Sequence, residues 1–359
     1  MHVACLNCGR PYPDSGAPYK CPACGGLYDY VEPLALDVSR SGCVTFWDRA
    51  ALLGFDLAPL TLGEGNTPLM ECEVFGWRIY LKCENTNPTG SFKDRGTATL
   101  VSFLRSRGVT EAIEDSSGNA GASFAAYAAR ADIRARVYVP ENASGPKRAQ
   151  IEMYGAEVAA IPGPRSSAAE AAWRTAEGGL PYASHAYLPF NLPGYATCAL
   201  EIAEQLGDAP AVVVLPVGQG GFLLGLERGF RALLQAGRIS RMPALVGVQA
   251  AACAPLAALF DMGIMGLSFV TEGTTVAEGV RVRSPLRARA VVDAARQSGG
   301  RLTSVDEAAI LPARDSLARL GFYVEPTSAL VWPTVLEIPP KIGGPIVAVL
   351  TGSGYKVRN

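Results

Sequence analysis

Short runs of apolar residues, rich in β-branched side chains, alternate with helix-like stretches from about Thr61 to the end of the chain. Each run is apolar throughout, whereas a strand with one face in water would alternate apolar and polar residues. This pattern predicts an α/β fold whose parallel sheets are covered by helices on both faces. The predicted strands are residues 78–83, 135–140, 157–161, 211–217, 244–249 and 345–351. The predicted helices are residues 92–107, 121–130, 146–154, 167–177, 194–206 and 223–234.

Three segments of glycine and small polar residues are each expected at the carboxyl end of a strand, the first of them as a strand-to-helix turn. They read SSGNAG at residues 116–121, GQGGF at residues 218–222 and TGSG at residues 351–354. In parallel sheets, ligands bind beyond the carboxyl ends of the strands, which is where all three segments fall. We therefore expect these segments to contribute to one shared ligand site.

A single lysine, Lys93, ends a turn rich in proline and glycine and opens a predicted helix in the segment NTNPTGSFKDRG, residues 85–96. Free N–H groups and the positive end of the helix dipole disfavour a second cation there, which favours the neutral, nucleophilic amine. A neutral amine in a pocket is what an imine with an aldehyde cofactor requires. Lys93 is therefore a candidate nucleophile, with a solvated lysine at a helix start as the alternative.

The loop at residues 218–222 can wrap an anion, because glycine lets the main chain approach closely and the following helix has unsatisfied N–H donors. It fits neither the dinucleotide fingerprint nor the P-loop, and the alternative is a tight strand-to-helix turn. Ser116, Ser117 and the N–H groups around Gly118 can hold a substrate carboxylate at a helix start. The alternative for this segment is a serine N-cap followed by an asparagine turn.

Four cysteines near the N-terminus form two C-x-x-C pairs, Cys5 with Cys8 and Cys21 with Cys24, separated by twelve residues. Glycine follows each pair and permits the tight turn that offers N–H groups to thiolates. This spacing predicts a structural zinc ribbon over residues 1–32. A ribbon that folds without metal and a pair of disulfides are the alternatives, and a DNA-binding ribbon is disfavoured by the scarcity of nearby cations.

The composition disfavours several other classes of protein. The formal net charge is −1 and no polybasic stripe occurs, which argues against a partner that is nucleic acid or a membrane surface. No run reaches about 18 uncharged apolar residues and no leader is visible, so we expect a cytoplasmic protein.

The remaining cysteines and the histidines indicate no further catalytic site. Most of these thiols have apolar neighbours, so we expect reduced, buried side chains at Cys43, Cys72, Cys83, Cys198 and Cys253. Only two histidines occur, and no nucleophile-elbow sequence accompanies either of them, which sets a Ser-His-Asp hydrolase aside.

Taken in order, the motifs at residues 63–69 (GEGNTPL), 87–96, 115–121, 215–222 and 346–354 resemble those of the fold-type II pyridoxal-phosphate (PLP) enzymes. Within that group the chain most resembles the threonine synthases. The resemblance covers essentially the whole chain, and the segment at residues 87–96 is its most specific part.

The resemblance implies a tryptophan synthase β-like fold with two three-layer α/β/α domains and an N-terminal zinc ribbon at residues 1–32. The larger, PLP-binding domain would comprise residues 33–80 and 185–359, and the smaller domain residues 81–184. A homodimer is the usual assembly of the family.

The resemblance also implies roles for individual residues. Lys93 would bind PLP covalently and remove the α-proton of the substrate, while Asn119 would contact the 3′-oxygen of the cofactor. Thr351 would bond the pyridine nitrogen. A hydroxyl there makes the ring a weaker electron sink than a carboxylate would, which suits elimination and replacement better than transamination. The phosphate of PLP would lie against Gly218, Gln219, Gly220, Gly221 and Phe222.

The implied reaction is that of threonine synthase, a carbon–oxygen lyase of amino-acid biosynthesis that converts O-phospho-L-homoserine and water into L-threonine and phosphate. One departure bears on the substrate. The arginine that usually helps to bind its phosphate is Asn191 here, and an amide cannot make a bidentate, charged contact. Pro193 and Tyr195 stand at the neighbouring positions that usually hold glutamate and lysine. Other candidates for the phosphate contact are Ser91, Arg95, Lys147 and Arg281.

Three alternatives follow from this departure. A threonine or serine ammonia-lyase needs no second phosphate site, and a β-replacement enzyme similar to cysteate synthase would use another nucleophile. A PLP-binding or zinc-ribbon scaffold without catalysis is disfavoured by the intact Lys93 motif. In every catalytic reading the partner is a small amino acid substrate.

Overall fold

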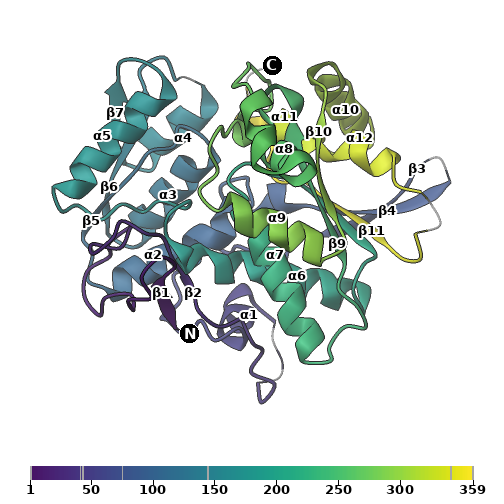
Figure 1. The fold of residues 1–359 in the computed structure, drawn as a ribbon, viewed down its shortest axis with the longest axis horizontal. Helices are drawn as coiled ribbons and strands as arrows, with labels where there is room; N and C mark the ends of the chain where they lie inside the picture. The colour runs from purple at the N-terminus through teal and green to yellow at the C-terminus, as the bar shows by residue number, and fades with distance from the viewer. Residues whose placement is uncertain are drawn as a thin grey trace. The chain divides into compact units, whose positions relative to one another are not determined.

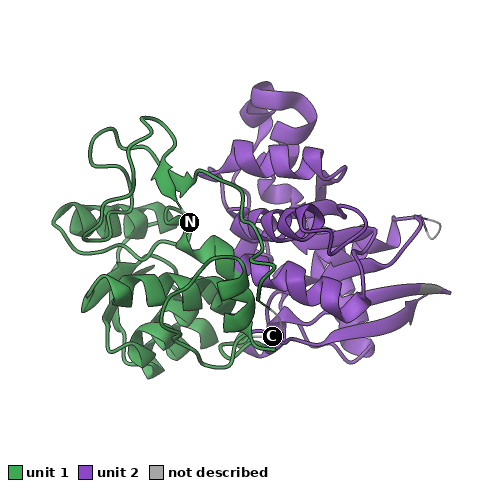
Figure 2. Cartoon of the chain, turned by 90° about the horizontal axis from the view of Figure 1, so that it is seen from below, with its two compact units in different colours: residues 1–64, 87–194, 356–359 green, residues 65–86, 195–355 purple. Residues whose placement is uncertain are grey.

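The computed structural model describes residues 2–40, 42, 44–74, 76–143, 145–339 and 342–357. Two compact units make up the chain (Figure 2). Unit 1 comprises Met1–Glu64, Asn87–Gly194 and Lys356–Asn359, and unit 2 comprises Gly65–Thr86 and Tyr195–Tyr355.

Unit 1 contains a three-stranded parallel sheet in the order β5-β6-β7 (Figure 1). Its strands are β5 (Glu111–Glu114), β6 (Arg134–Pro140) and β7 (Glu157–Ile161). A small antiparallel pair precedes it, β1 (Val3–Cys5) with β2 (Tyr28–Tyr30). The helices are α1 (Phe46–Leu52), α2 (Lys93–Ser106), α3 (Asn119–Arg130), α4 (Pro146–Met153), α5 (Arg165–Glu177) and the short 3₁₀ helix η2 (Pro189–Asn191).

Unit 2 contains a six-stranded sheet in the order β10-β9-β8-β11-β4-β3. Its strands are β3 (Leu69–Val74), β4 (Trp77–Lys82), β8 (Val212–Pro216), β9 (Ala244–Ala250), β10 (Arg301–Val305) and β11 (Ile346–Val349). Its helices are α6 (Leu192–Leu206, from residue 195), α7 (Gly221–Gln235), α8 (Pro255–Met262), α9 (Ala288–Gln297), α10 (Glu307–Arg319), α11 (Pro326–Ala329) and α12 (Val331–Leu336). Short 3₁₀ helices are η1 (Glu84–Thr86), η3 (Ala251–Cys253), η4 (Gly263–Phe269), η5 (Glu278–Val280) and η6 (Gly354–Lys356, to residue 355).

The central strands of unit 2 are covered on both faces. Every residue of β8 and β11 is buried, and successive residues of a strand point to opposite faces. One face of these strands shares a core with α10, α11 and α12, while α7 and α9 pack against β9. This arrangement confirms the prediction that was drawn from continuous apolar runs.

The predicted strands and helices agree with the structure, but the edge strands of the larger sheet were not predicted. Every predicted strand and helix is present with ends within two residues of those expected. No range was predicted for β1, β2, β3, β5 or β10. Of these, β3 and β10 lie at the two edges of the six-stranded sheet and carry partly exposed polar side chains. β3 also pairs antiparallel with β4, so the sheet is not parallel throughout.

The contacts group the chain differently from the predicted domains, because the first 64 residues belong to unit 1. Tyr12 and Tyr28 are buried in one core with Phe103 of α2 and Phe190 of η2. The rings of Phe103 and Phe190 stack with centroids 3.5 Å apart, and the Tyr12 ring meets Phe190 edge-on at 5.0 Å. The cysteine-bearing segment therefore contributes to the core around α2 rather than forming a core of its own.

No helix among the residues described in this structure has the length and apolar character needed to cross a bilayer.

Of the cysteines expected to be buried, Cys83, Cys198 and Cys253 are buried and form no disulfide, and Cys72 is half-buried. Cys43 lies outside the described residues.

A buried ion pair ties β4 to α6 within unit 2. Lys82 is fully buried, and its ammonium donates to Glu201 at 2.9 Å, to Gln205 at 2.9 Å and to the Thr67 carbonyl at 2.8 Å. The other Glu201 oxygen accepts from the Asn66 main-chain N–H at 2.9 Å. All three ammonium donors are used, so the pair fixes the turn around residues 66–67.

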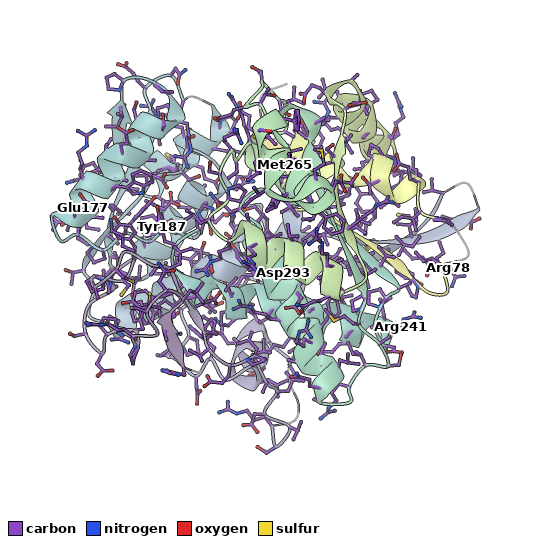
Figure 3. All side chains as sticks on the ribbon, in the orientation of Figure 1. Arg78, Glu177, Tyr187, Arg241, Met265 and Asp293 are labelled. Atoms are coloured by element: carbon purple, nitrogen blue, oxygen red, sulfur yellow. The ribbon has the colours of Figure 1, made fainter. Side chains whose placement is uncertain are left out.

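We expect Lys82→Met to destabilise the protein by about 3–5 kcal/mol, because Glu201 would keep a buried charge without its partner. The matched control is Arg78→Met, which removes an exposed partner of Glu71 in the same sheet (Figure 3) and should cost less than about 1 kcal/mol. Urea denaturation of both variants measures the difference. Equal, small losses in the two variants would contradict the assignment of Lys82 as a structural counter-ion.

Candidate active site

Lys93 is the first residue of α2, as the sequence predicts. The turn before it closes with a hydrogen bond of 2.7 Å from the Gly90 N–H to the Asn87 carbonyl, and Gly90 has a φ of 83°, a left-handed conformation that suits glycine. No side chain caps the helix at Phe92, whose ring centroid lies 4.9 Å from the Lys93 ammonium. The lysine side chain is half-buried.

The carboxylate of Asp94 fixes this turn from inside the core of unit 1. Asp94 is fully buried and accepts from the Thr89 N–H at 2.7 Å, the Thr89 hydroxyl at 2.6 Å and the Ser123 hydroxyl of α3 at 2.7 Å. Burial raises the pKa of the Asp94 carboxyl to about 6, while the bonds from Ser123 and Thr89 oppose the increase. The carboxylate thereby joins the turn, α2 and α3.

The segment at residues 116–119 also lies in unit 1, between β5 and α3. Asn119 is the first residue of α3, and the Gly118 N–H donates to the Ser116 hydroxyl at 3.2 Å. A side chain at Gly121 would meet the Ser116 carbonyl, since an added Cβ would lie 1.8 Å from that oxygen. Lys93 and Asn119 thus begin two packed helices, which the hydrogen bond from Ser123 to Asp94 connects.

Sequence reasoning missed two residues beside this segment. Glu114 ends β5 and is buried, and its carboxylate lies 3.1 Å from the Nδ1 atom of His185. Burial raises the pKa of Glu114 to about 8, with the negative charge of Asp115 adding to it, while burial and the charge of Lys93 hold the pKa of His185 well below its usual range. The available signal was a glutamate two residues before the SSGN motif in a chain with only two histidines.

Asn191, which replaces the expected phosphate-binding arginine, has a different use. Its side chain is buried, and Nδ2 donates to the main-chain carbonyl of His185 at 2.6 Å. Of the other candidates for a phosphate contact, Arg95 is fully buried and Arg281 lies 3.8 Å from Glu272. The Ser91 hydroxyl is buried and has no hydrogen-bond partner among the described residues.

In unit 2, the loop at residues 218–222 and Thr351 follow β8 and β11, which are parallel neighbours. Both segments therefore lie at the same edge of the sheet. Gly220 adopts a left-handed φ of 86°, and an added Cβ would lie 2.2 Å from a methyl carbon of Val291. Thr351 is buried, with its hydroxyl oxygen 3.1 Å from that of Ser328.

The main-chain N–H groups of residues 218–221 donate to no acceptor in the described part of the chain. The Gln219 side chain is engaged elsewhere, because its oxygen accepts from the Leu286 N–H at 3.2 Å, and the Phe222 ring packs near Tyr195. Four free donors at the start of α7, with glycine at three of the four positions, are the chemistry that binds an anion such as a phosphate.

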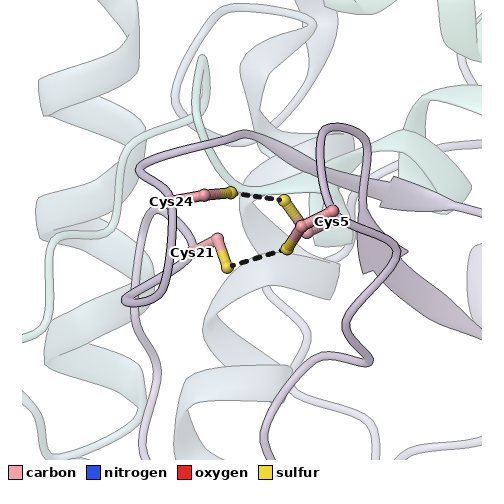
Figure 4. Close-up of side chains that lie close together, drawn as sticks. Cys5, Cys21 and Cys24 are labelled. Atoms are coloured by element: carbon pink, nitrogen blue, oxygen red, sulfur yellow. Dashed lines mark hydrogen bonds between the residues drawn. The ribbon is translucent and has the colours of Figure 1, made fainter.

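The four N-terminal cysteines of unit 1 converge (Figure 4). Their sulfur atoms lie within 4.8 Å of one another, with Cys5 and Cys24 at 3.5 Å and Cys8 and Cys21 at 3.7 Å. Burial raises the pKa of the Cys21 thiol, but main-chain N–H groups outweigh it and lower the pKa to about 6. The cluster can therefore hold a metal ion that prefers thiolate ligands.

Comparison with known proteins assigns the chain to a family. Residues 60–352 match the family described as "Pyridoxal-phosphate dependent enzyme". The chain belongs to this family. It is therefore an α/β PLP-dependent enzyme of fold type II, and a lyase.

Within the family, the chain groups with the threonine synthases. It is 34% identical to the threonine synthase of Methanosarcina acetivorans, over 91% of this chain and 84% of that one. It is 35% identical to the threonine synthase of Mycobacterium bovis, over 91% of each chain, and 37% identical to that of Mycobacterium leprae, over 85% of each.

Solved structures share the fold of this PLP-dependent enzyme. The threonine deaminase of T.th. aligns with a TM-score of 0.68 and 27% identity, over 82% of this chain and 94% of that one. Maize serine racemase aligns with a TM-score of 0.71 and 20% identity, over 90% and 94% of the two chains.

We expect Asp94→Asn to destabilise the protein by about 1–3 kcal/mol, because a single amide oxygen replaces the two oxygens that bind three buried donors. The variant should also change the pH dependence. In the folded wild type the raised pKa keeps a proton on Asp94 at pH values where the unfolded chain has already released it. The free energy of unfolding of the wild type therefore falls as the pH rises from about 4 through about 6. That part of the slope should be absent from Asp94→Asn.

Chemical denaturation at a series of pH values checks this expectation, with exposed Asp132→Asn in the same unit as the control. A slope in Asp94→Asn as steep as in the wild type would contradict the account of this carboxyl group.

Proposed function

We propose that this PLP-dependent enzyme is a threonine synthase that converts O-phospho-L-homoserine and water into L-threonine and phosphate. The observation that carries the proposal is the 34–37% identity to enzymes of that name over 85–92% of this chain. The position of Lys93 at the start of α2, on a turn fixed by a buried carboxylate, supports it.

We propose that Lys93 binds the cofactor covalently and that residues 218–222 hold its phosphate. The four free N–H donors of that loop fit an anion. Thr351 would face the pyridine nitrogen and Asn119 the 3′-oxygen. When bound, PLP supplies an electron sink for the carbanion that forms when the α-proton leaves.

The remaining steps in this proposal belong to the side chains of the chain itself. The start of α3, with Ser116, Ser117 and Gly118, would bind the substrate α-carboxylate, since helix N-termini stabilise anions. The Nζ atom of Lys93 would take the α-proton and return it, as a general base and then a general acid.

The second candidate is a threonine or serine ammonia-lyase. The Asn191 amide is neutral and donates to the His185 carbonyl, so it supplies no cation for a substrate phosphate. A threonine deaminase is among the similar structures at 27% identity. In the synthase reading, the buried Ser91 hydroxyl next to the Lys93 turn is our candidate for the phosphate contact. The third reading, a cysteate synthase-like β-replacement enzyme, has no separate structural support.

A panel of substrates separates these candidates. Phosphohomoserine should release phosphate and threonine in equal amounts, and serine or threonine should release little ammonia. Ammonia and an oxo-acid from threonine or serine, with no phosphate released from phosphohomoserine, would replace the synthase assignment with the lyase.

The variant Ser91→Ala should raise the KM for phosphohomoserine more than it lowers kcat, because it removes a binding contact.

We further propose that Cys5, Cys8, Cys21 and Cys24 bind a structural zinc ion, which makes residues 1–32 a zinc ribbon. Four sulfur atoms around zinc at about 2.3 Å are separated by roughly 3.8 Å. The distances of 3.5 Å and 3.7 Å between two of the sulfur pairs approach this separation. The ion would stabilise the core that Tyr12 and Tyr28 share with α2. A cytoplasmic homodimer in amino-acid biosynthesis remains our prediction for the assembled enzyme.

The double variant Cys5→Ser/Cys21→Ser tests the zinc proposal. We expect the wild type to contain one equivalent of zinc, and the double variant to lose it and to melt at a lower temperature, because a structural zinc site contributes directly to folding. Elemental analysis and thermal denaturation give the two readouts, with Cys72→Ser as the control. Full zinc content in the double variant would refute the ligand assignment.

A further inference from the structure

Two main-chain hydrogen bonds in unit 2 join the start of α11 to the TGSG segment, residues 351–354. The Glu325 N–H donates to the Gly352 carbonyl at 3.0 Å. The Gly354 N–H donates to the Tyr323 carbonyl at 3.0 Å. These two bonds hold the main chain that follows β11, so the position of Thr351 at the end of that strand is fixed.

Ser328, in α11, is the partner of the Thr351 hydroxyl in the described part of the chain. The two oxygen atoms lie 3.1 Å apart, and both side chains are buried. The Ser328 oxygen also accepts from the Gly352 N–H at 2.7 Å and lies 3.1 Å from the Gly352 carbonyl. A serine hydroxyl has one proton, which can go to either neighbour. The Gly352 carbonyl already accepts from the Glu325 N–H, so it does not need the Ser328 proton.

The direction of these hydrogen bonds decides what the Thr351 hydroxyl can offer to a ligand. When Ser328 donates to Thr351, the proton of Thr351 is available for an acceptor beyond the pair. When Thr351 donates to Ser328, the Thr351 oxygen can only accept. The first arrangement runs from the Gly352 N–H through both hydroxyls, and hydrogen bonds in such a chain polarise one another. That arrangement therefore makes Thr351 a stronger donor than an isolated threonine.

We propose that Ser328 is a positioning residue that orients the Thr351 hydroxyl as a hydrogen-bond donor to an unprotonated ring nitrogen. This inference rests on the proposed function, which assigns Thr351 to the pyridine nitrogen of PLP. An unprotonated nitrogen accepts the Thr351 proton through its lone pair, whereas a protonated one would need an acceptor. Ser328 thereby favours the unprotonated ring, the weaker electron sink that suits elimination and replacement.

A cofactor analogue in which C–H replaces the ring nitrogen measures this contact without catalysis. The full-length protein, freed of cofactor with hydroxylamine, is titrated with PLP and with the analogue. Both compounds keep the aldehyde and the phosphate, so the ratio of their dissociation constants reports on the nitrogen alone. We expect the wild type to bind PLP about fivefold more tightly than the analogue, the effect of one hydrogen bond. In Ser328→Ala the ratio should fall to about twofold, because Thr351 loses its orienting donor.

Two further variants separate this role from a general loss of packing. Ser298 is a buried serine of the same unit that accepts from the Leu245 N–H at 3.1 Å and donates to the Ala295 carbonyl at 2.8 Å. Ser298→Ala removes the same kind of main-chain contacts and should leave the ratio at about fivefold. Ser328→Cys keeps most of the volume and a weak donor, so its ratio should lie between those of the wild type and Ser328→Ala. It also tests the proposal if Ser328→Ala does not fold.

Thr351→Val distinguishes failure of this inference from failure of the proposed function. Its ratio should be about one, because the donor itself is gone. A ratio that falls in Thr351→Val but equals that of the wild type in both Ser328 variants would overturn the role of Ser328 alone. A wild type that binds neither compound, or binds both equally, would overturn the proposed contact of Thr351 with PLP, and this inference with it.

Discussion

The buried carboxylate of Asp94 is the interaction on which the candidate site depends. It binds both donors of Thr89 and the hydroxyl of Ser123, so one side chain defines the turn, the start of α2 and the contact of α2 with α3. Helix α2 then begins at Lys93 and α3 at Asn119. Burying a carboxylate without these hydrogen bonds would cost free energy, so the fold of unit 1 depends on the donors that surround Asp94.

A second constraint comes from the parallel strands. Their carboxyl ends meet at one edge of each sheet, which brings the loop at residues 218–222 next to Thr351 in unit 2 and places His185 beside Glu114 in unit 1. The substitution at Asn191 is connected to this second pair, because its amide holds the His185 carbonyl. Asn191 therefore helps to hold His185 beside Glu114 in this chain.

The sequence predicted the buried parts of the fold well, because continuous apolar runs report burial on both faces. In the six-stranded sheet it missed β3 and β10, whose partly exposed polar residues reflect their places at the sheet edges, and in unit 1 it gave no range for the short strand β5. For the site, it identified Lys93 at the helix start and the glycine loop, since both depend on local turn chemistry. It could not identify the Glu114–His185 pair, because the two residues are 71 positions apart and meet only through the strand-like pairing of residues 181–183. Nor could it place Tyr12 and Tyr28 in the core around α2, because that packing joins residues that are far apart in the sequence.

The central claim is that the nitrogen of Lys93 carries the cofactor, and reduction with borohydride tests it most directly. Reduction makes the bond between a lysine and PLP permanent, so digestion and mass spectrometry can locate the added pyridoxyl group. The chain has six lysines, at positions 20, 82, 93, 147, 341 and 356. The account predicts one pyridoxyl group per chain, on the peptide that contains Lys93. A group on any other lysine, with Lys93 unmodified, would contradict it.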